Sequence, residues 1–351
     1  MKAAVLHKGV MAIEEVPEPV PAVGQVLAAP LACGVCGSDL HARDHGAHLC
    51  DLLHRAGFRG FMDPERPVVM GHEFCAALLE PAAGLPRGQR VVAQPFLVDA
   101  NGIALIGYSN LYNGAFAERM LLQSDALLSV PDTVETDIAA MTEPLAVAVH
   151  AVNQSGADQN CAFAVYGCGP VGLFIIARLR ALGWGPILAI DPVPARRAMA
   201  ERMGADNIVA PDGGASAAWW QGLHLHVGLS DTMAAMGQAA KRAVIFECVG
   251  KPGMLTAIAE AAPVASTITV AGVCMESDAI EPALLIQKSL QLRFVFAYSP
   301  DEFAEAFAMI CADPAALAPL VTGETPLAAI DQAFAALTAG GEQVKMMVKP
   351  N

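Results

Sequence analysis

The chain has 351 residues, which is long enough for two domains with separate cores, and its 54% hydrophobic and 16% charged residues favour a globular protein over a disordered one. Its net charge of −14, with no basic run to offset it, argues against a nucleic-acid partner. No uninterrupted apolar run reaches the roughly 18 residues of a membrane-spanning helix, so we expect no membrane partner. Nine irregularly spaced cysteines without a signal peptide predict a cytoplasmic protein with reduced thiols.

The first 130 or so residues are interrupted often by proline and glycine. Short alternating or apolar runs occur between these interruptions, at 1–6, 26–28, 91–93 and 119–122. This pattern is typical of an irregular, mostly antiparallel β domain.

From about residue 137 the pattern changes to helices that alternate with apolar strands. A helix is expected over 137–153, with a kink at Glu143-Pro144. Strands are expected at 161–166, 187–190, 208–210, 243–247 and 267–271, and helices at 170–182 and 195–203. This alternation predicts right-handed βαβ units and a doubly wound, Rossmann-type parallel sheet with helices on both faces.

Near the C-terminus a helix is expected over 300–310 and a strand over 343–348. The segment 213–238, which contains Trp219 and Trp220, has no clear periodicity, and we interpret it as a surface excursion between two units of the sheet. The chain is thus expected to be an α/β protein with one domain over 1–150, completed by 298–351, and a second domain over 151–297.

A glycine-rich turn lies between the strand at 161–166 and the helix that follows it. Its sequence is Gly167-Cys168-Gly169-Pro170-Val171-Gly172. The first glycine permits the tight turn, the second lets a pyrophosphate approach the backbone, and the third lets the helix pack on the strand. Asp191 closes the next strand about 20 residues further on, where an acid that binds ribose is expected. We therefore expect a dinucleotide site here; the alternative is a turn that serves packing alone.

The acid at this position also predicts which dinucleotide binds. Asp191 would accept hydrogen bonds from the adenosine ribose and repel a 2′-phosphate, which favours NAD over NADP. Arg196 and Arg197 follow closely and would weaken that preference.

A second set of residues has the chemistry of a zinc site. Cys36 offers a thiolate, His72 an imidazole, and Glu73 and Glu143 carboxylates. A catalytic zinc needs about three protein ligands and one open position. Spacing alone is a weak signal here, because no short ligand repeat exists and a single cysteine or histidine is more often structural.

The sequence around these residues resembles the zinc-dependent medium-chain alcohol dehydrogenase family. The resemblance rests on Gly34-Val35-Cys36-Gly37-Ser38-Asp39-Leu40-His41, on Gly71-His72-Glu73 and on the glycine turn, and it covers nearly the whole chain. It implies a GroES-like catalytic domain over 1–150, completed by 298–351, and an NAD-binding Rossmann domain over 151–297.

The same resemblance implies roles around the metal. Cys36 and His72 match the two constant zinc ligands, and Glu143, in Glu-Pro-Leu, matches the carboxylate ligand of the polyol and threonine dehydrogenase branch. Glu73 matches an acid beside the zinc that ligates directly or gives way to water. Three further residues match catalytic positions: Asp39, the acid that orients the histidine, and Ser38 and His41, the proton relay.

On the cofactor side, the resemblance places Arg196 near the adenosine ribose and Lys345 near the pyrophosphate. Gly167, Gly169, Pro170, Val171 and Gly172 would form the phosphate turn, with Cys248-Val249 and Gly272-Val273 along the nicotinamide half. Phe96 falls where relatives have an aromatic wall of the substrate pocket.

The chain departs from the family pattern in two places near the expected site. No cysteine lies between Cys75 and Cys161, and the lobe that carries a structural zinc in many relatives is shortened to about 100–113, so we expect one catalytic zinc and no structural one. The stretch from His41 to His72 is longer than usual. We interpret its extra part, 44–65, as an elaborated loop with solvated histidines; the alternatives are a lid over the substrate cleft and, after it, a second metal site.

We therefore predict an enzyme that transfers a hydride between a secondary alcohol or polyol and NAD, with zinc as the Lewis acid. A homodimer or homotetramer is expected from the resemblance. Two alternatives stay open from the sequence: a zinc-free quinone or enone reductase on the same fold, and a non-catalytic dinucleotide-binding protein.

Overall fold

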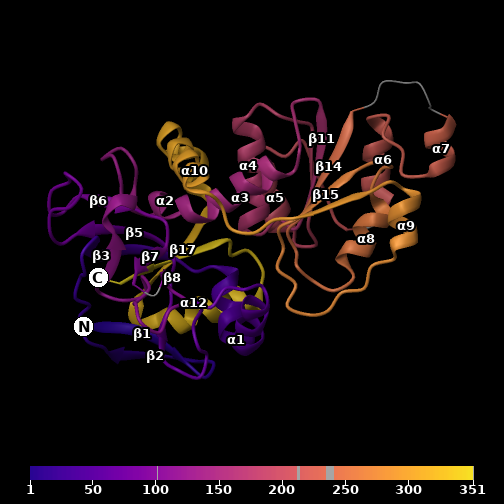
Figure 1. Ribbon diagram of the computed structural model, residues 1–351. Coiled ribbons are helices and arrows are strands. Elements are labelled where there is room, and N and C mark those ends of the chain that lie inside the picture. The colour runs from indigo at the N-terminus through magenta and orange to yellow at the C-terminus, as the bar shows by residue number, and fades with distance from the viewer. Residues whose placement is uncertain (101, 212–213, 235–240, 351) are drawn as a thin grey trace. The chain divides into compact units, whose positions relative to one another are not determined.

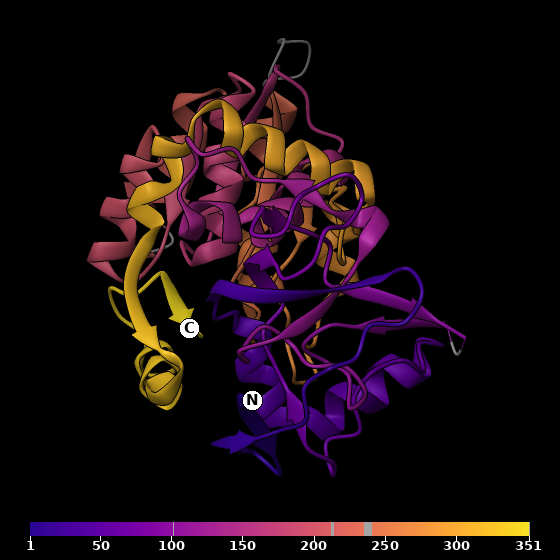
Figure 2. The same ribbon diagram turned by 90° about the vertical axis from the view of Figure 1, so that its left-hand side faces the viewer.

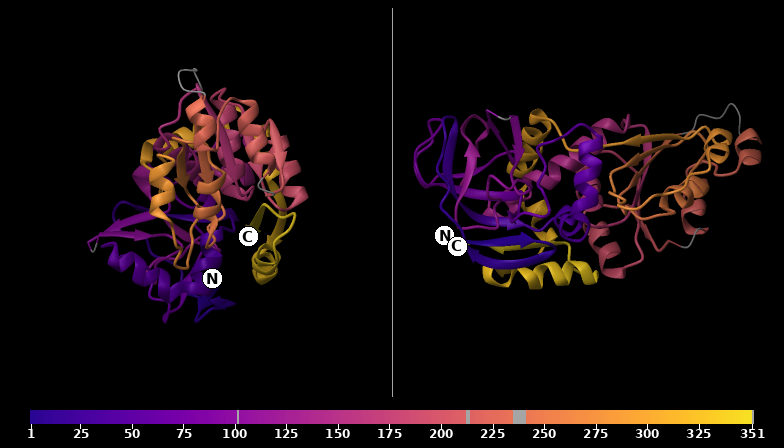
Figure 3. Two further views of the ribbon diagram at one scale, coloured as in Figure 1. Left: turned by 90° about the vertical axis from the view of Figure 1, so that its right-hand side faces the viewer. Right: turned by 60° about the horizontal axis from the view of Figure 1, so that its bottom comes forward.

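The computed structural model describes residues 1–100, 102–211, 214–234 and 241–350, and in it the chain forms two compact units. The first unit comprises Met1–Glu143 and Phe303–Asn351, and the second comprises Pro144–Glu302. The chain leaves the first unit once and returns to it, so both chain ends belong to that unit (Figure 3).

The first unit is built mainly from antiparallel strands, as its sequence pattern predicts. A small sheet has the order β2 (Val10–Glu15), β1 (Lys2–His7), β4 (Val68–Val69). The larger sheet has the order β10 (Leu128–Ser129), β6 (Arg90–Val92), β5 (Glu73–Leu78), β3 (Gln25–Gly34), β18 (Lys345–Lys349), β17 (Val321–Pro326), and β9 (Met120–Gln123) also pairs with β3. A hairpin joins β7 (Phe96–Asp99) to β8 (Gly102–Leu105) in the shortened lobe.

Strand β3 connects the two ends of the chain within this sheet. It pairs antiparallel with β5, β9 and β18, and only β17 and β18 run parallel. In the register with β18, Met347 lies opposite Gly34. This pairing brings the C-terminal strand, near the yellow end of the colour range, into the same sheet as β3 (Figure 1).

Helix α1 (Gly37–Arg55) corrects one expectation from the sequence. The loop predicted for 44–65 is wrong for 44–55, which continue the helix and bend at His45 (Figure 2). Ala42 and Gly46 are buried at helical spacing and give the helix an inward face, while His45 and His48 are exposed. The remaining part, 56–65, is irregular.

Short helices complete the first unit and lead into the second. They are η1 (Ser124–Ala126), α2 (Thr136–Ala140), α3 (Thr142–Gln154), α10 (Pro300–Ala312), α11 (Pro314–Leu317), η2 (Ala318–Leu320), η3 (Leu327–Ala329) and α12 (Ile330–Ala339). The helix expected over 137–153 is interrupted at Met141 rather than at Glu143-Pro144. Proline is tolerated there because it lies in the first turn of α3, where its missing N–H is not needed.

The second unit is a six-stranded parallel sheet with the order β13 (Asn207–Val209), β12 (Ile187–Ile190), β11 (Cys161–Tyr166), β14 (Arg242–Glu247), β15 (Thr267–Val270), β16 (Gln291–Phe294). This is the doubly wound Rossmann order. Helices α4 (Pro170–Ala181) and α5 (Pro194–Arg202) cover one face, and α6 (Gly214–Gly222), α8 (Met254–Ala261) and α9 (Pro282–Gln287) cover the other (Figure 1). The predicted Rossmann fold is thus confirmed, and β16 is a strand that the sequence analysis missed.

The interpretation of 213–238 as a surface excursion is also wrong for 214–222, whereas 228–231 are exposed as expected. Residues 214–222 form α6, and Leu229–Ala234 form α7. Trp220 has no exposed surface and packs with Leu225 in the core on one face of the sheet. Residues 213 and 235–238 lie outside the described residues.

Among the described residues, no single helix is long and apolar enough to cross a bilayer. The bent pair Pro300–Ala312 and Pro314–Leu320 meets the length and composition test only when its two helices, which meet at 99°, are taken together.

Candidate metal and cofactor sites

Three potential metal ligands meet in the first unit. Cys36, His72 and Glu73 each contribute one ligand atom, and these atoms all lie within 4.8 Å of one another. Cys36 immediately precedes α1, and Glu73 begins β5. Because β3 and β5 pair with Gly34 opposite Glu73, the loop that leaves β3 toward Cys36 is held beside the residue that enters β5, His72. The strand pairing therefore places the thiol and the imidazole together.

Asp39 connects the two ligands. Its side chain is fully buried; Oδ2 accepts the backbone N–H of Cys36 at 2.9 Å, and Oδ1 lies 3.3 Å from His72 Nδ1. Burial alone lowers the pKa of His72, but the charge and hydrogen bond of Asp39, with the Cys36 thiol, raise it well above its usual value. Burial and the charge of Glu73 raise the pKa of Cys36. A metal ion that binds here displaces the proton of the thiol as it takes the thiolate for a ligand.

Glu73 forms a buried ion pair with Lys345. The Lys345 Nζ lies 2.8 and 2.6 Å from the two carboxylate oxygens, and both side chains are 1% exposed. Gly34 makes room for this pair, because a Cβ at that position would lie 2.2 Å from Glu73 Oε2. Lys345 thus neutralises the acid beside the thiol, and its expected role near the pyrophosphate stays a prediction.

Glu143, the expected carboxylate ligand, lies in the first turn of α3 and is not one of the three clustered ligands. Its charge acts on Lys345 and on Tyr108, so it lies in the surroundings of the cluster. Whether Glu143 ligates stays a prediction.

The donor set fits zinc. A soft sulfur, an imidazole nitrogen and a carboxylate oxygen converge in a buried position, which is the ligand chemistry that zinc prefers. An acid that contacts the far nitrogen of the histidine is also typical of zinc sites.

The two residues expected to form a proton relay lie on the first turns of α1. His41 is half-buried, and burial, with the nearby His45, lowers its pKa, which favours the neutral imidazole that accepts a proton. Ser38 Oγ accepts a hydrogen bond of 2.7 Å from the hydroxyl of Tyr108.

Tyr108 is a residue of this site that the sequence analysis missed. Its hydroxyl also lies 3.4 Å from Asp39 Oδ1, and its ring centroid lies 5.0 Å from that of His72. Burial, followed by the charges of Asp39 and Cys36, raises its pKa well above the usual value, so it stays a neutral donor. Tyr108 belongs to no motif, and the only signal is that an aromatic residue follows Gly107 in the shortened lobe. Phe96, the expected pocket wall, begins β7 and pairs with Leu105, and its role stays a prediction.

In the second unit the glycine turn has the geometry of a phosphate cradle. Gly167 has a φ of +91°, and a Cβ there would lie 3.0 Å from the backbone of Cys248. A Cβ at Gly172 would lie 2.0 Å from the carbonyl oxygen of Gly167. A Cβ at Gly169 would meet nothing within 4 Å, so the backbone there is bare at the start of α4. A bare backbone at a helix N-terminus fits a pyrophosphate.

Asp191 is buried at the end of β12 and holds this turn. Its Oδ2 accepts the N–H of Cys168 and its Oδ1 accepts the N–H of Val193, both at 2.8 Å. Arg196 is half-buried on α5, and its neighbour Arg197 donates to the carbonyl of Asp191 at 2.6 Å. The acid thus orders the turn through the backbone, and its contact with a ribose stays a prediction.

The loops that follow β14 and β15 lie together at the same end of the sheet. Glu247 accepts the N–H groups of Val249 and Gly250 at 2.6 and 2.9 Å. A Cβ at Gly272 would lie 2.5 Å from the nitrogen of Gly250, and Val273 next to it is 50% exposed. The positions expected along the nicotinamide are therefore neighbours in the fold.

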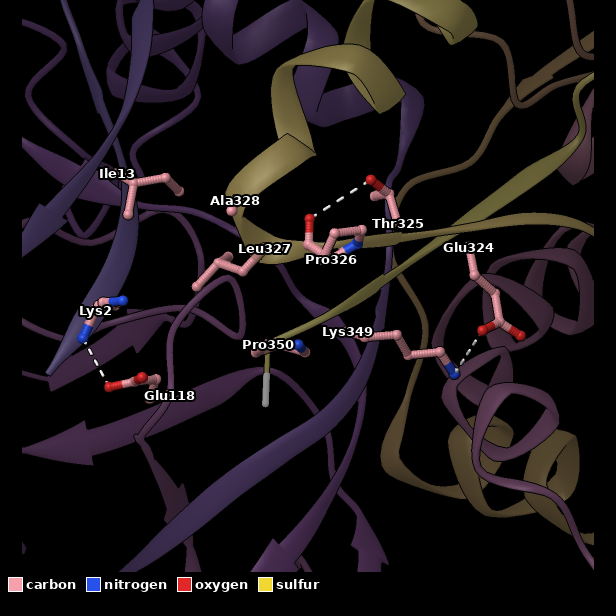
Figure 4. A pocket seen from close by; sticks show the side chains of 10 residues that line it. All are labelled: Lys2, Ile13, Glu118, Glu324, Thr325, Pro326, Leu327, Ala328, Lys349 and Pro350. Carbon is pink, nitrogen blue, oxygen red and sulfur yellow. Dashed lines mark hydrogen bonds and ion pairs between the residues drawn. The ribbon is translucent and has the colours of Figure 1, made fainter.

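A pocket of about 550 Å³ on the first unit is a different feature (Figure 4). The residues that line it come mainly from β17 and η3, and none of the clustered metal ligands is among them. The ammonium of Lys349 there is compensated by Asp137 and Glu324. We assign no catalytic role to this pocket.

Two family descriptions match the chain. Residues 22–132 match the alcohol dehydrogenase GroES-like domain, and residues 170–312 match the zinc-binding dehydrogenase domain. The first contains Cys36, His72 and Glu73, and the second begins inside the glycine turn.

Curated relatives agree with these matches. The (R,R)-butanediol dehydrogenase of Bacillus subtilis is 29% identical over the full length of both chains. The sorbitol dehydrogenase of the same organism is 30% identical over 60% of this chain and 61% of its own.

Solved structures show the same fold. The crystal structure of 2R,3R-butanediol dehydrogenase from Bacillus subtilis covers 100% of this chain and 99% of its own, with a TM-score of 0.78 and 28% identity. That of L-idonate 5-dehydrogenase from Escherichia coli covers 99% and 97%, with a TM-score of 0.79 at 22% identity, and supports the fold alone.

The named relatives are dehydrogenases of alcohols and polyols, so they favour an alcohol dehydrogenase over a quinone reductase or a non-catalytic binding protein. The description of the second matched domain, a zinc-binding dehydrogenase, agrees with a protein that binds zinc and a nicotinamide dinucleotide. The chain belongs to the zinc-dependent medium-chain alcohol dehydrogenase family.

Proposed function

We propose that this enzyme transfers a hydride between NAD and a secondary alcohol or polyol of the class that includes 2,3-butanediol and sorbitol. The observation that carries the proposal is the cluster of the partly buried Cys36 with the buried His72 and Glu73, with Ser38 on the adjoining turn of α1. The names of the relatives support the substrate class.

In the proposed mechanism, Cys36 and His72 hold zinc, with Glu143 as the third ligand. Zinc bound there supplies a Lewis acid that lowers the pKa of an alcohol. Ser38 accepts the hydroxyl proton, and His41 carries it onward to solvent. Asp39 keeps His72 in the orientation that presents its other nitrogen to the metal.

Glu73 has a different role in this proposal. Its carboxylate is already neutralised by Lys345, so it stays beside the metal as an ion pair and leaves a coordination position open for water or substrate. We propose a single zinc, because the chain has no cysteines in the shortened lobe.

The second unit is proposed to bind NAD through the backbone at Gly169 and the acid Asp191, with Arg196 as a further contact. A carboxylate at the end of β12 disfavours the 2′-phosphate of NADP. Val249 and Val273 are proposed to line the nicotinamide half.

We further propose a homodimer or homotetramer. Edge strand β16 carries Phe294, which is 70% exposed, and Phe296 just beyond it is 78% exposed. Apolar side chains of this size on a sheet edge favour a covered surface, and a second copy of the chain would cover it. A cytoplasmic location remains proposed on the basis of nine free cysteines, and cell fractionation would test it.

Replacing the proposed thiolate ligand should remove zinc and activity together. We expect Cys36→Ala to lose bound zinc and to slow oxidation of (R,R)-2,3-butanediol with NAD at least about 100-fold, because the metal loses its soft ligand. The matched control is Cys33→Ala, which changes a buried cysteine whose thiol donates to the backbone carbonyl of Gly34. This variant should keep both zinc and activity. Full zinc and turnover in Cys36→Ala would refute the assignment.

A methyl group at the bare position of the glycine turn should block the cofactor. We expect Gly169→Ala to weaken NADH binding about 10-fold or more without a change in melting temperature, because its Cβ points into open space in the free protein. The control is Gly222→Ala on α6, where a Cβ would also meet nothing within 4 Å. It should change neither the NADH affinity nor the melting temperature. Titration of NADH fluorescence measures the affinity, and equal binding by the wild type and Gly169→Ala would contradict the proposed cradle.

The oligomer proposal predicts a mass of two or four chains by light scattering. Phe294→Glu should shift the protein toward a smaller species, because a charge on the edge strand disfavours pairing. A monomeric wild type at micromolar concentration would contradict the proposal.

A further inference from the structure

We propose that Tyr108 is a positioning residue for proton transfer, because its hydroxyl holds Ser38 in the orientation that accepts the proton of the substrate alcohol. The inference rests on the proposed function and adds to it a residue that belongs to none of the motifs of the chain. It is carried by the 2.7 Å hydrogen bond from Tyr108 to Ser38 Oγ.

The hydrogen bond from Tyr108 limits which further hydrogen bonds the Ser38 hydroxyl can form. A hydroxyl has one hydrogen to donate and two lone pairs that accept. Tyr108 occupies one lone pair of Ser38, which leaves one lone pair for the substrate and one hydrogen for transfer onward. The contact therefore fixes the direction in which Ser38 relays a proton.

The proton balance is simple. The O–H bond of the alcohol breaks as a new O–H bond forms on Ser38, and the hydrogen that Ser38 carried leaves toward His41 and solvent. Tyr108 keeps its own proton throughout and donates the same hydrogen bond before and after the transfer.

Close backbone packing places Tyr108 at this point. Gly107 has a φ of +86°, and a Cβ there would lie 3.0 Å from the backbone of Gly71. The two glycines thus bring their chain segments into direct contact, and the residues that follow them, Tyr108 and His72, lie with ring centroids 5.0 Å apart. A larger residue at either glycine would move the hydroxyl away from Ser38.

The lengthened segment that precedes β4, residues 56–67, also contacts Tyr108. Phe61 stacks on Tyr108 with centroids 5.3 Å apart and an interplanar angle of 26°. Asn110 ties the same segment to the loop of Tyr108: its Oδ1 accepts the N–H of Asp63 at 2.7 Å, and its Nδ2 donates to the carbonyl of Pro67 at 3.1 Å. The extra residues between His41 and His72 therefore hold the ring of Phe61 against Tyr108, beside the proton relay.

A double-mutant cycle tests whether Tyr108 acts through Ser38. We expect Tyr108→Phe to keep zinc content and melting temperature and to lower kcat for (R,R)-2,3-butanediol about 10-fold, with KM changed less than about twofold. In a Ser38→Ala background the same replacement should change kcat less than about twofold, because no hydroxyl remains to be oriented. Tyr112→Phe is the matched control; it removes a hydroxyl bonded to Asp99 at 2.7 Å and should leave kcat unchanged.

Two results would overturn the inference while the proposed function stands: an undiminished kcat in Tyr108→Phe, or an equal loss in the wild-type and Ser38→Ala backgrounds, which would mean general disturbance of the site. A loss of zinc or of thermal stability in Tyr108→Phe would likewise assign the residue a structural role and overturn it. A zinc-loaded wild type without alcohol turnover would overturn the proposed function, and this inference with it.

Discussion

The buried carboxylate of Asp39 is the interaction on which the arrangement of the metal site depends. A buried charge without partners destabilises a fold by several kcal/mol, so its contacts determine what surrounds it. One oxygen accepts the backbone N–H of Cys36 at the start of α1, and the other lies against His72 and the hydroxyl of Tyr108. A thiol, an imidazole and a phenol from three separate segments are thereby held around one anion.

Close backbone approach is the second constraint, and three glycines provide it. Gly34 leaves room for the ion pair of Glu73 and Lys345, and Gly71 and Gly107 allow two loops to touch where their next residues meet. A Cβ at each of these positions would lie 3.0 Å or less from a neighbouring atom. The precise placement of the site therefore depends on positions that carry no chemistry themselves.

In the second unit, too, a buried carboxylate, that of Asp191, organises the backbone of the site. Asp191 is buried at the end of β12, and its two oxygens accept N–H groups from the glycine turn and from the start of the next segment. The acid therefore shapes the cradle before any cofactor contact is considered. Because these two N–H groups satisfy the carboxylate of Asp191, the acid is compatible with the turn even though it is almost fully buried.

Sequence reasoning was most successful where periodicity and local motifs determine the structure. Strand 161–166 and strand 187–190 agree with β11 and β12 because buried parallel strands are continuous apolar runs bounded by glycine or an acid. The proximity of Cys36 to His72 was predictable only from the family resemblance, since it depends on the long-range pairing of β3 with β5.

The residues that the sequence did not reveal share a physical cause. Tyr108 becomes a site residue through contacts with Ser38 and His72, about 70 and 36 positions away in sequence, and no local pattern encodes such contacts. The ion pair of Lys345 with Glu73 was not predicted either, because it depends on the antiparallel pairing of β18 with β3. The helix over 44–55 was missed because its many histidines and aspartates obscured a weak apolar face.

Zinc content per chain, measured by elemental analysis of the purified wild type and of His72→Ala, tests the central claim most directly. The account predicts one zinc per chain in the wild type and its loss in the variant, since Cys36 and Glu143 alone do not complete a tetrahedral site. A wild type without zinc would contradict the ligand assignment and return a zinc-free reductase to consideration. Two zinc ions per chain would contradict the single site and require further ligands elsewhere in the chain.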